Sequence, residues 1–144
     1  MTTVKNLLDE KGHIILSVSP DTLVIDALKI MAEKNLGVLL VTSGDKLLGI
    51  FSERDYARKI VLKGKTSAKT TVSEIMTSDV VTVSPEQSID DCMVIMAARH
   101  IRHLPVVEQN KLVGLISILD VVKHLISERE QTIEQLKNYI SGTR

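Results

Sequence analysis

Hydrophobic and polar positions follow one another along the chain in a block that occurs twice. Each block opens with a short β-branched run, Ile14–Val18 and then Val80–Val83, which predicts a strand. A Ser-Pro pair, at 19–20 and 84–85, ends each run. An acidic residue after each proline, Asp21 or Glu86, predicts the first turn of a helix, because it faces the positive end of the helix dipole.

The helix expected after each Ser-Pro pair has apolar residues at positions i, i+3, i+4 and i+7, the pattern of one buried stripe. These residues are Val24, Ala27, Leu28 and Met31 in the first block and Ile89, Cys92, Met93 and Met96 in the second. Two short apolar runs with turn-forming residues between them then predict a β-hairpin. The runs cover 38–41 and 47–51, then 103–107 and 112–116. A second helix is expected to begin at Ser52 and at Ser117.

The two blocks align without a gap at a spacing of 65 residues. Identical pairs at this spacing include Asp26 and Asp91, Gly49 and Gly114, and Asp55 and Asp120. Chance does not maintain one register over most of a block, so the chain contains an internal duplication. We predict an α/β fold of two βαββα repeats, at 7–66 and 72–130, followed by a C-terminal helical extension at 131–144. The polar segment 64–71 is interpreted as a helix end followed by an exposed linker.

The last helix differs from its counterpart in length. It is expected to run from Ser117 to about Ile140, on the order of 35 Å. Ile126, Ile133 and Leu136 continue its apolar stripe beyond the end of the repeat. Such a stripe either folds back onto its own domain or forms a contact in an oligomer, and the sequence favours neither.

Composition excludes several classes of protein. The chain has 144 residues and one cysteine, which rules out a disulfide-stabilised secreted scaffold. Its formal net charge is zero and it contains only three aromatic residues, so nucleic acid is not an expected partner. The N-terminus has no apolar run long enough for a signal peptide or a membrane span. These features predict a cytoplasmic protein without a membrane partner.

The strongest shared motif is Gly-h-h-Ser-x-x-Asp, where h is hydrophobic. It covers Gly49 to Asp55 and again Gly114 to Asp120, at a strand end followed by a helix start. One interpretation is a capping box that satisfies the first amides of the helix. The other is a ligand site, in which the helix N-terminus binds phosphate and the carboxylate accepts hydrogen bonds from two ribose hydroxyls. In that second interpretation the glycine lets the backbone approach the ligand closely.

The order of strand, Ser-Pro, helix, hairpin and Gly-h-h-Ser-x-x-Asp, present twice in tandem, resembles the CBS domain pair, or Bateman module. The phrases 49–58 (GIFSERDYAR) and 101–107 (IRHLPVV) are particularly similar to stand-alone CBS-pair proteins. The resemblance covers nearly the whole chain. It implies two repeats related by a pseudo-twofold axis, with a cleft that holds AMP, ADP, ATP, NAD or S-adenosylmethionine in various members.

The resemblance also implies roles for individual residues. Asp55 and Asp120 would bind ribose hydroxyls, with Ser52 and Ser117 beside them. The adenine pocket would be lined by Ile15, Ser17, Val38, Leu39, Val81, Thr82, His103, Leu104 and Pro105. The phosphate partners would be Arg54, Arg58, Lys59, Arg102 and His103, although Arg58 and Lys59 equally fit a solvated helix face. Because Arg102 and His103 have no charged counterpart in the first repeat, we expect two unequal sites or one ligand that spans both.

No cofactor other than the adenine nucleotide is expected. Cys92, His100 and His103 could suggest a metal, but Cys92 lies on the apolar helix face and a helix-to-strand boundary separates the histidines. No phosphate-binding glycine loop or activated nucleophile is evident. We therefore expect a regulatory binding module that dimerises and signals to an unknown downstream protein. A structural dimer scaffold and a nucleotide-processing enzyme are the alternatives.

Overall fold

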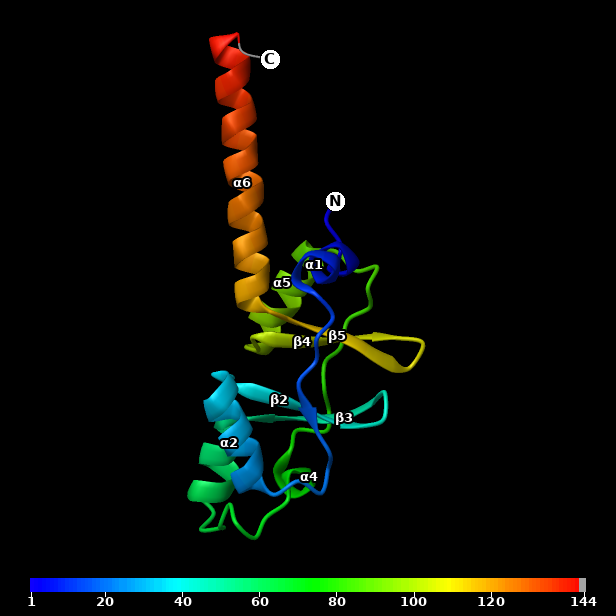
Figure 1. Cartoon of the computed structure of the whole chain (residues 1–144), viewed down its shortest axis with the longest axis vertical. Helices are drawn as coiled ribbons and strands as arrows, with labels where there is room; N and C mark the ends of the chain where they lie inside the picture. Colours follow the sequence, from blue (N-terminus) through cyan, green and yellow to red (C-terminus); the bar gives the residue numbers. More distant parts are fainter. Residues whose placement is uncertain (143–144) are drawn as a thin grey trace. The chain divides into compact units, whose positions relative to one another are not determined.

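The computed structural model describes residues 1–142 and shows a mixed α/β fold (Figure 1). In chain order its elements are α1 (Val4–Lys11), β1 (Ser17–Val18), α2 (Val24–Lys34), β2 (Val38–Ser43), β3 (Lys46–Ser52), α3 (Glu53–Asp55), the π-helical turn η1 (Tyr56–Val61), α4 (Val72–Ile75), α5 (Ile89–Arg99), β4 (His103–Glu108), β5 (Lys111–Ser117) and α6 (Ile118–Ser141). The expected order of strand, helix, hairpin and helix is therefore confirmed in the first repeat, and the order of helix, hairpin and helix is confirmed in the second.

The chain divides into two compact units that do not follow the order of the sequence. The first-repeat unit contains Ile14–Thr82 together with Val107–Val113, the tip of the second hairpin. The second-repeat unit contains Met1–His13, Val83–Val106 and the chain from Gly114 onward. The helix that precedes the first repeat, α1, thus packs with the second repeat. The helix that precedes the second repeat, α4, packs with the first. We call these two the lead-in helices. The predicted boundaries 7–66, 72–130 and 131–144 stay a prediction.

The first-repeat unit is built on a three-stranded sheet. β1 pairs in parallel with β2, and β2 pairs antiparallel with β3. The predicted stripe of α2 is buried, because Val24, Ala27 and Met31 are at most 3% exposed. They pack in one core with residues of the sheet, of η1 and of α4: Val18, Leu39, Val41, Phe51, Ile60, Val72 and Ile75.

The second-repeat unit repeats this plan with a smaller sheet. β4 pairs with β5, and the strand before them is reduced to one parallel bridge between Val83 and Val106. The stripe of α5 is again buried at Ile89, Cys92 and Met96. The N-terminus is tied to this unit by backbone hydrogen bonds, such as that from the Val4 amide to Gln87 O at 2.8 Å.

Two local expectations about each repeat were wrong. The first strands are shorter than predicted, since only Ser17–Val18 and Val83 have strand pairing. The helices begin at Val24 and Ile89, three residues later than expected. The reason is that each Ser-Pro pair opens a β-turn, closed by a hydrogen bond from residue 22 to Ser19 O and from residue 87 to Ser84 O. Asp21 and Glu86 therefore lie in turns.

The segment 64–71 is not a purely exposed linker, as the sequence had suggested. Thr70 is 6% exposed, and its carbonyl accepts a 2.8 Å hydrogen bond from the Val24 amide. The Ser67 carbonyl accepts a second bond, 2.9 Å long, from the Ile25 amide. The linker thereby satisfies the first amides of α2, which has no side-chain N-cap of its own.

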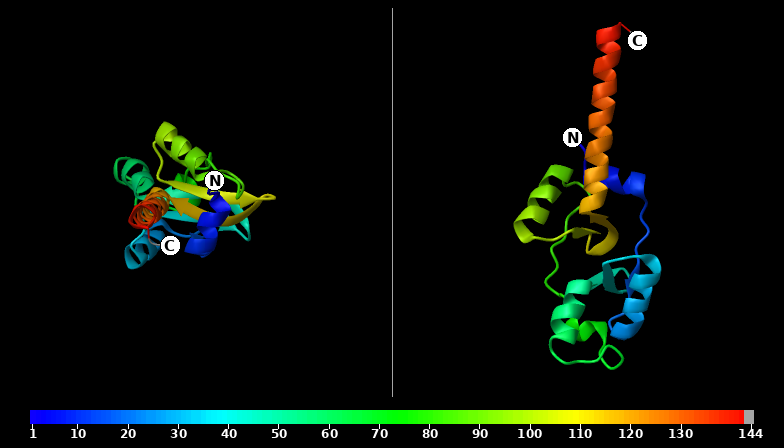
Figure 2. Two further views of the ribbon diagram at one scale, coloured as in Figure 1. Left: turned by 90° about the horizontal axis from the view of Figure 1, so that it is seen from above. Right: turned by 90° about the vertical axis from the view of Figure 1, so that its left-hand side faces the viewer.

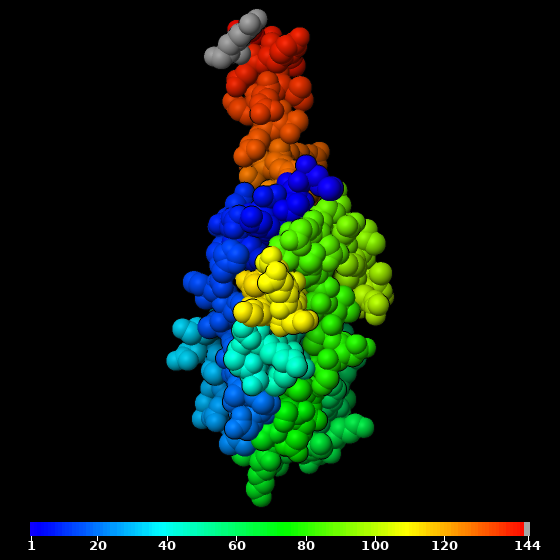
Figure 3. Space-filling view, turned by 90° about the vertical axis from the view of Figure 1, so that its right-hand side faces the viewer, coloured from blue at the N-terminus to red at the C-terminus, as the bar shows by residue number. Residues whose placement is uncertain are grey.

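Helix α6 has the expected length and extends away from the rest of the second-repeat unit (Figures 1 and 2). Its first part is held against the N-terminal segment by His124, whose Nδ1 lies 3.5 Å from Glu10 Oε2 and whose Nε2 lies 3.2 Å from Thr2 Oγ1. Every residue from 126 to 142 is exposed, and the space-filling view shows the red end of the helix projecting beyond the N-terminal residues (Figure 3). The alternative in which the stripe folds back onto its own domain is therefore wrong.

Candidate functional site

The first copy of the motif forms a closed carboxylate cluster of Ser52, Asp55, Lys59 and Thr77, all in the first-repeat unit. The amide and hydroxyl of Ser52 both donate to Asp55 Oδ2 at 3.0 Å. Thr77 Oγ1 donates to Asp55 Oδ1 at 3.2 Å, and Lys59 Nζ lies 3.0 Å from the same oxygen. Both oxygens of Asp55 therefore have protein partners, and its side chain is only 8% exposed.

The second copy forms a more open carboxylate cluster of Lys11, Ser117 and Asp120 in the second-repeat unit. The Ser117 amide donates to Asp120 Oδ2 at 2.9 Å, and Lys11 Nζ donates to the same oxygen at 2.5 Å. Lys11 also donates to Leu115 O at 2.7 Å. Oδ1 of Asp120 accepts no hydrogen bond from residues 1–142, and the side chain is 22% exposed. One carboxylate oxygen is thus accessible to a ligand.

Electrostatics distinguish the open cluster further. Burial by itself would raise the pKa of Asp120, but the hydrogen bonds from Lys11 and Ser117 and the charge of Lys11 outweigh it and lower the pKa. Burial lowers the pKa of His103, and the positive charges of Lys11 and Arg102 add to this effect against the charge of Asp120. At neutral pH Asp120 is therefore a charged carboxylate, and the neighbouring His103 is an uncharged imidazole.

Both copies of the motif form capping boxes, so that structural interpretation is confirmed. The Asp55 and Asp120 amides donate to the Ser52 and Ser117 hydroxyls. The first amide of each helix is also used, since Glu53 N donates to Gly37 O at 3.1 Å and Ile118 N to Arg102 O at 2.8 Å. The expected array of free helix amides for phosphate is therefore largely occupied by the protein, and phosphate binding would depend on side chains.

The motif glycines have a packing role that differs from the expected approach to a ligand. A Cβ on Gly49 would lie 2.6 Å from Met76 Sδ and 2.8 Å from Thr77 O. A Cβ on Gly114 would lie 2.7 Å from a methyl carbon of Leu8. Each glycine thus leaves room for the lead-in segment that packs in its unit.

The adenine-pocket candidates of the first-repeat unit lie in unlike environments. Ile15, Val38 and Val81 are half-buried, whereas Ser17 and Thr82 are exposed. Ser17 Oγ accepts a 3.1 Å hydrogen bond from Thr42 Oγ1. Leu39 is 1% exposed and belongs to the hydrophobic core.

Two candidates of the second-repeat unit, Arg102 and His103, lie near the open cluster. His103 is half-buried and Arg102 is exposed at the start of β4. Leu104 is completely buried, and Pro105 is buried with its carbonyl accepting a 3.0 Å bond from the Val83 amide. Their contact with a base stays a prediction.

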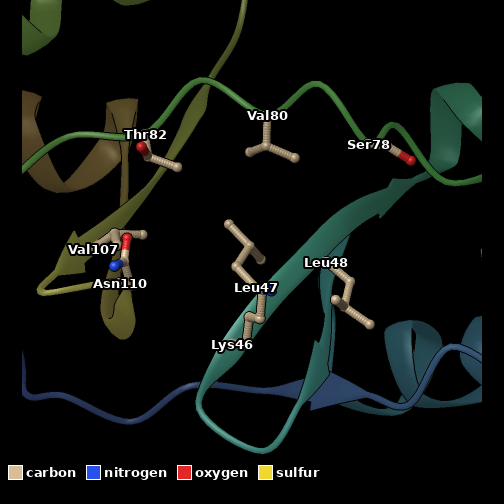
Figure 4. Close-up of a pocket in the computed structure, with 8 residues that line it drawn as sticks. All are labelled: Lys46, Leu47, Leu48, Ser78, Val80, Thr82, Val107 and Asn110. Atoms are coloured by element: carbon tan, nitrogen blue, oxygen red, sulfur yellow. The ribbon is translucent and has the colours of Figure 1, made fainter.

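A hollow of about 560 Å³ lies in the first-repeat unit (Figure 4). Its lining combines apolar side chains with polar ones: Lys46, Leu47, Leu48, Ser78, Val80, Thr82, Val107 and Asn110. Thr82 is the residue that the sequence had also named. The others were missed because they lie in the two hairpins and in the segment before Val83, where no motif marks them.

Among the phosphate candidates, Arg54 and Arg58 are exposed on α3 and η1. The Lys59 side chain is 41% exposed, but its ammonium is already paired, since it lies 3.0 Å from Asp55 Oδ1 and donates to Ile75 O at 2.9 Å. The sequence missed Lys11 and Thr77, which complete the two clusters. Lys11 and Thr77 follow two short segments that resemble each other, 4–8 (VKNLL) and 72–76 (VSEIM), and this similarity was the one available signal.

The metal candidates have structural roles. His100 ends α5 in the left-handed conformation, with φ of 54°, as Asn35 ends α2. Cys92 is completely buried, and burial raises the pKa of its thiol to about 11. Within residues 1–142, no three side chains of His, Cys, Asp or Glu group together as metal ligands.

Comparison with known proteins identifies the family. The model of the CBS domain family matches residues 11–62 and 72–127. The chain is 37% identical to the mitochondrial CBS domain-containing protein CBSX3 of Arabidopsis thaliana, over 98% of this chain and 73% of that protein. It is 32% identical to the CBS domain-containing protein YhcV of Bacillus subtilis, over 88% of each chain.

A solved structure gives the same result. The crystal structure of the CBS domain NE2398 is 45% identical, with a TM-score of 0.83 over 88% of this chain and 99% of that one. No helix within residues 1–142 has the length and apolar character needed to cross a membrane. Both halves of the duplication match the family model, so the chain belongs to the CBS domain family and carries two CBS repeats.

Proposed function

We propose that this protein is a regulatory module that binds an adenine nucleotide (AMP, ADP, ATP or NAD) and signals to a downstream protein without catalysing a reaction. Family membership supports the regulatory role. The observation that carries the ligand is the open cluster around Asp120, because Oδ1 of this carboxylate is unused within residues 1–142. A carboxylate in this state can accept hydrogen bonds from ribose hydroxyls.

The two motif copies have unequal roles in this proposal. Asp120 binds the ribose, and the exposed Arg102 supplies positive charge for phosphate. Asp55 holds its own unit together through Ser52, Thr77 and Lys59, so it contributes little direct affinity.

Isothermal titration calorimetry with AMP, ADP, ATP and NAD tests the proposal. Asp120→Asn should weaken the bound nucleotide at least tenfold, or about 1.4 kcal/mol, because it loses a charge-assisted hydrogen bond. The matched variant Asp55→Asn should keep the affinity within about threefold in the fraction that remains folded. Equal losses in the two variants would contradict the unequal roles.

The same titration separates the alternatives. A nucleotide present at a hundred times its dissociation constant should add about 2.7 kcal/mol to the free energy of unfolding. Absence of heat and of a thermal shift at millimolar nucleotide would favour a structural scaffold. Nucleotide turnover that disappears in Asp120→Ala would favour an enzyme.

Signalling in this proposal is a shift of conformational population. A nucleotide that binds one arrangement of the repeats more tightly stabilises that arrangement and changes the affinity for the downstream protein by the same coupling free energy. We also propose a homodimer as the signalling form and the cytoplasm as its location. Mass spectrometry of the ligand that co-purifies with the protein would identify the nucleotide.

A further inference from the structure

The exposed face of α6 has a heptad pattern. Its positions are spaced alternately by three and four residues, which is the repeat of a helix that packs against another helix in a left-handed coiled coil. All but Arg129 are apolar: Leu119, Val122, Ile126, Arg129, Ile133, Leu136 and Ile140.

This stripe is uncovered. The exposed fractions are 53% for Ile126, 44% for Ile133, 56% for Leu136 and 83% for Ile140. The contacts of α6 with α1 come from its first part, through Asp120 and His124, and Glu128 accepts a hydrogen bond from Thr2, just before α1. Every residue from 129 to 142 is exposed, so the fold of this chain alone leaves much of this apolar surface in contact with water.

We propose that the stripe pairs with α6 of a second copy of this chain in a two-stranded coiled coil. Isoleucine occupies the a positions 126, 133 and 140, and leucine occupies the d position 136. β-branched residues at a with leucine at d favour two strands over three or four. The same surface on both copies gives the closed twofold pairing that is commonest among homo-oligomers.

Charge on this part of the helix agrees with self-association. From 126 to 141 the sequence has Arg129 and Lys137 against Glu128, Glu130 and Glu134. Two copies of this segment therefore approach each other without strong electrostatic repulsion. Arg129 lies in the seam, the row of a and d positions that faces the partner helix, and Glu130 lies beside it in sequence. In a symmetric pair each Arg129 can therefore reach Glu130 of the other helix. Such a polar layer fixes the register of the two helices. The slight acidic excess disfavours an anionic membrane as the occupant.

Sedimentation equilibrium of the full chain tests the proposal. The double variant Ile133→Lys/Leu136→Lys should weaken dimerisation at least a hundredfold. The matched control Gln131→Lys/Asn138→Lys places the same charges on the opposite face of the helix and should leave the dimer unchanged. Circular dichroism should show that each variant keeps its fold.

Two results would overturn the inference: a wild-type monomer, whether free or bound to anionic vesicles, and a dimer that survives the seam variant. This inference rests on the proposed homodimer but not on nucleotide binding. Titration of the same variants with AMP, ADP, ATP and NAD distinguishes failure of the coiled coil from failure of nucleotide binding, because loss of the coiled coil should leave the nucleotide affinity of each chain unchanged.

Discussion

The carboxylate clusters around Asp55 and Asp120 come from one duplicated motif but differ in their freedom. In both, a serine caps a helix and the aspartate caps the serine amide in return. The difference comes from the residues that contact the carboxylate in addition to the serine. Thr77 and Lys59 occupy the second oxygen of Asp55, whereas Lys11 binds the oxygen of Asp120 that Ser117 already uses. A shared motif therefore fixes the cap, and the segment that packs beside it decides whether the carboxylate is available.

The two motif glycines should give the largest difference between the copies. Gly49→Ala is expected to reduce the free energy of unfolding by about 3 kcal/mol, because the new methyl group meets the Thr77 carbonyl, a backbone atom that cannot move freely. Gly114→Ala should cost about 1 kcal/mol, since it meets the flexible end of Leu8. Urea denaturation followed by circular dichroism measures both values. Equal losses of stability would mean that the backbone at Thr77 and the side chain of Leu8 move aside equally easily.

Removal of the carboxylates should give the next largest difference. Asp55→Ala leaves the Ser52 amide and the Lys59 ammonium without their partner in a 6% exposed position, and we expect a loss of about 2 kcal/mol. Asp120→Ala should cost about 1 kcal/mol, because water can reach its partners. For a chain of this size the two variants should melt about 3 °C apart. A larger loss for Asp120→Ala would reverse the comparison.

Replacement of Lys11 should make the second cluster more like an isolated carboxylate. Lys11→Met is expected to cost about 0.5 to 1 kcal/mol at pH 7 and to raise the pKa of Asp120. A carboxylate with a lowered pKa stabilises the fold above its ordinary value of 3.8 and loses this contribution as the pH falls through the folded-state value. The difference between wild type and variant should therefore shrink below about pH 4. NMR titration of Asp120 measures the pKa directly, and an unchanged value would contradict the ion pair.

The smallest effect should come from His103, which has no charged counterpart in the first repeat. Because burial and the charge of Lys11 lower its pKa, the unfolded chain binds a proton more readily than the folded one. This histidine stabilises the fold above its ordinary value of 6.5 and loses that contribution as the pH falls through its folded-state value. His103→Gln should flatten the stability profile in that range by less than about 1 kcal/mol. A profile unchanged by the substitution would mean that His103 is not held neutral.

The periodicity of the sequence predicted the architecture well. The stripes of α2 and α5, the two hairpins and the long last helix lie where the apolar spacing placed them. The errors lie at boundaries. A Ser-Pro pair suits a helix start and a β-turn equally, and the turn formed because proline favours its second position. The short first strands lacked partners for most of their length.

The candidate site was only partly visible in the sequence. Ser52, Asp55, Ser117 and Asp120 could be named because the duplication marks them twice. Lys11 and Thr77 could not, because each lies far along the chain from the carboxylate that it contacts.

The sequence by itself determined the duplication, the repeated cap and the class of fold, since these depend on local spacing and on short-range hydrogen bonds. The tertiary structure decided which lead-in segment packs with which repeat. That choice depends on contacts over long sequence separations, such as Leu8 with Gly114 and Met76 with Gly49. The duplicated motif therefore appears in one copy as a closed structural cluster and in the other as an open carboxylate.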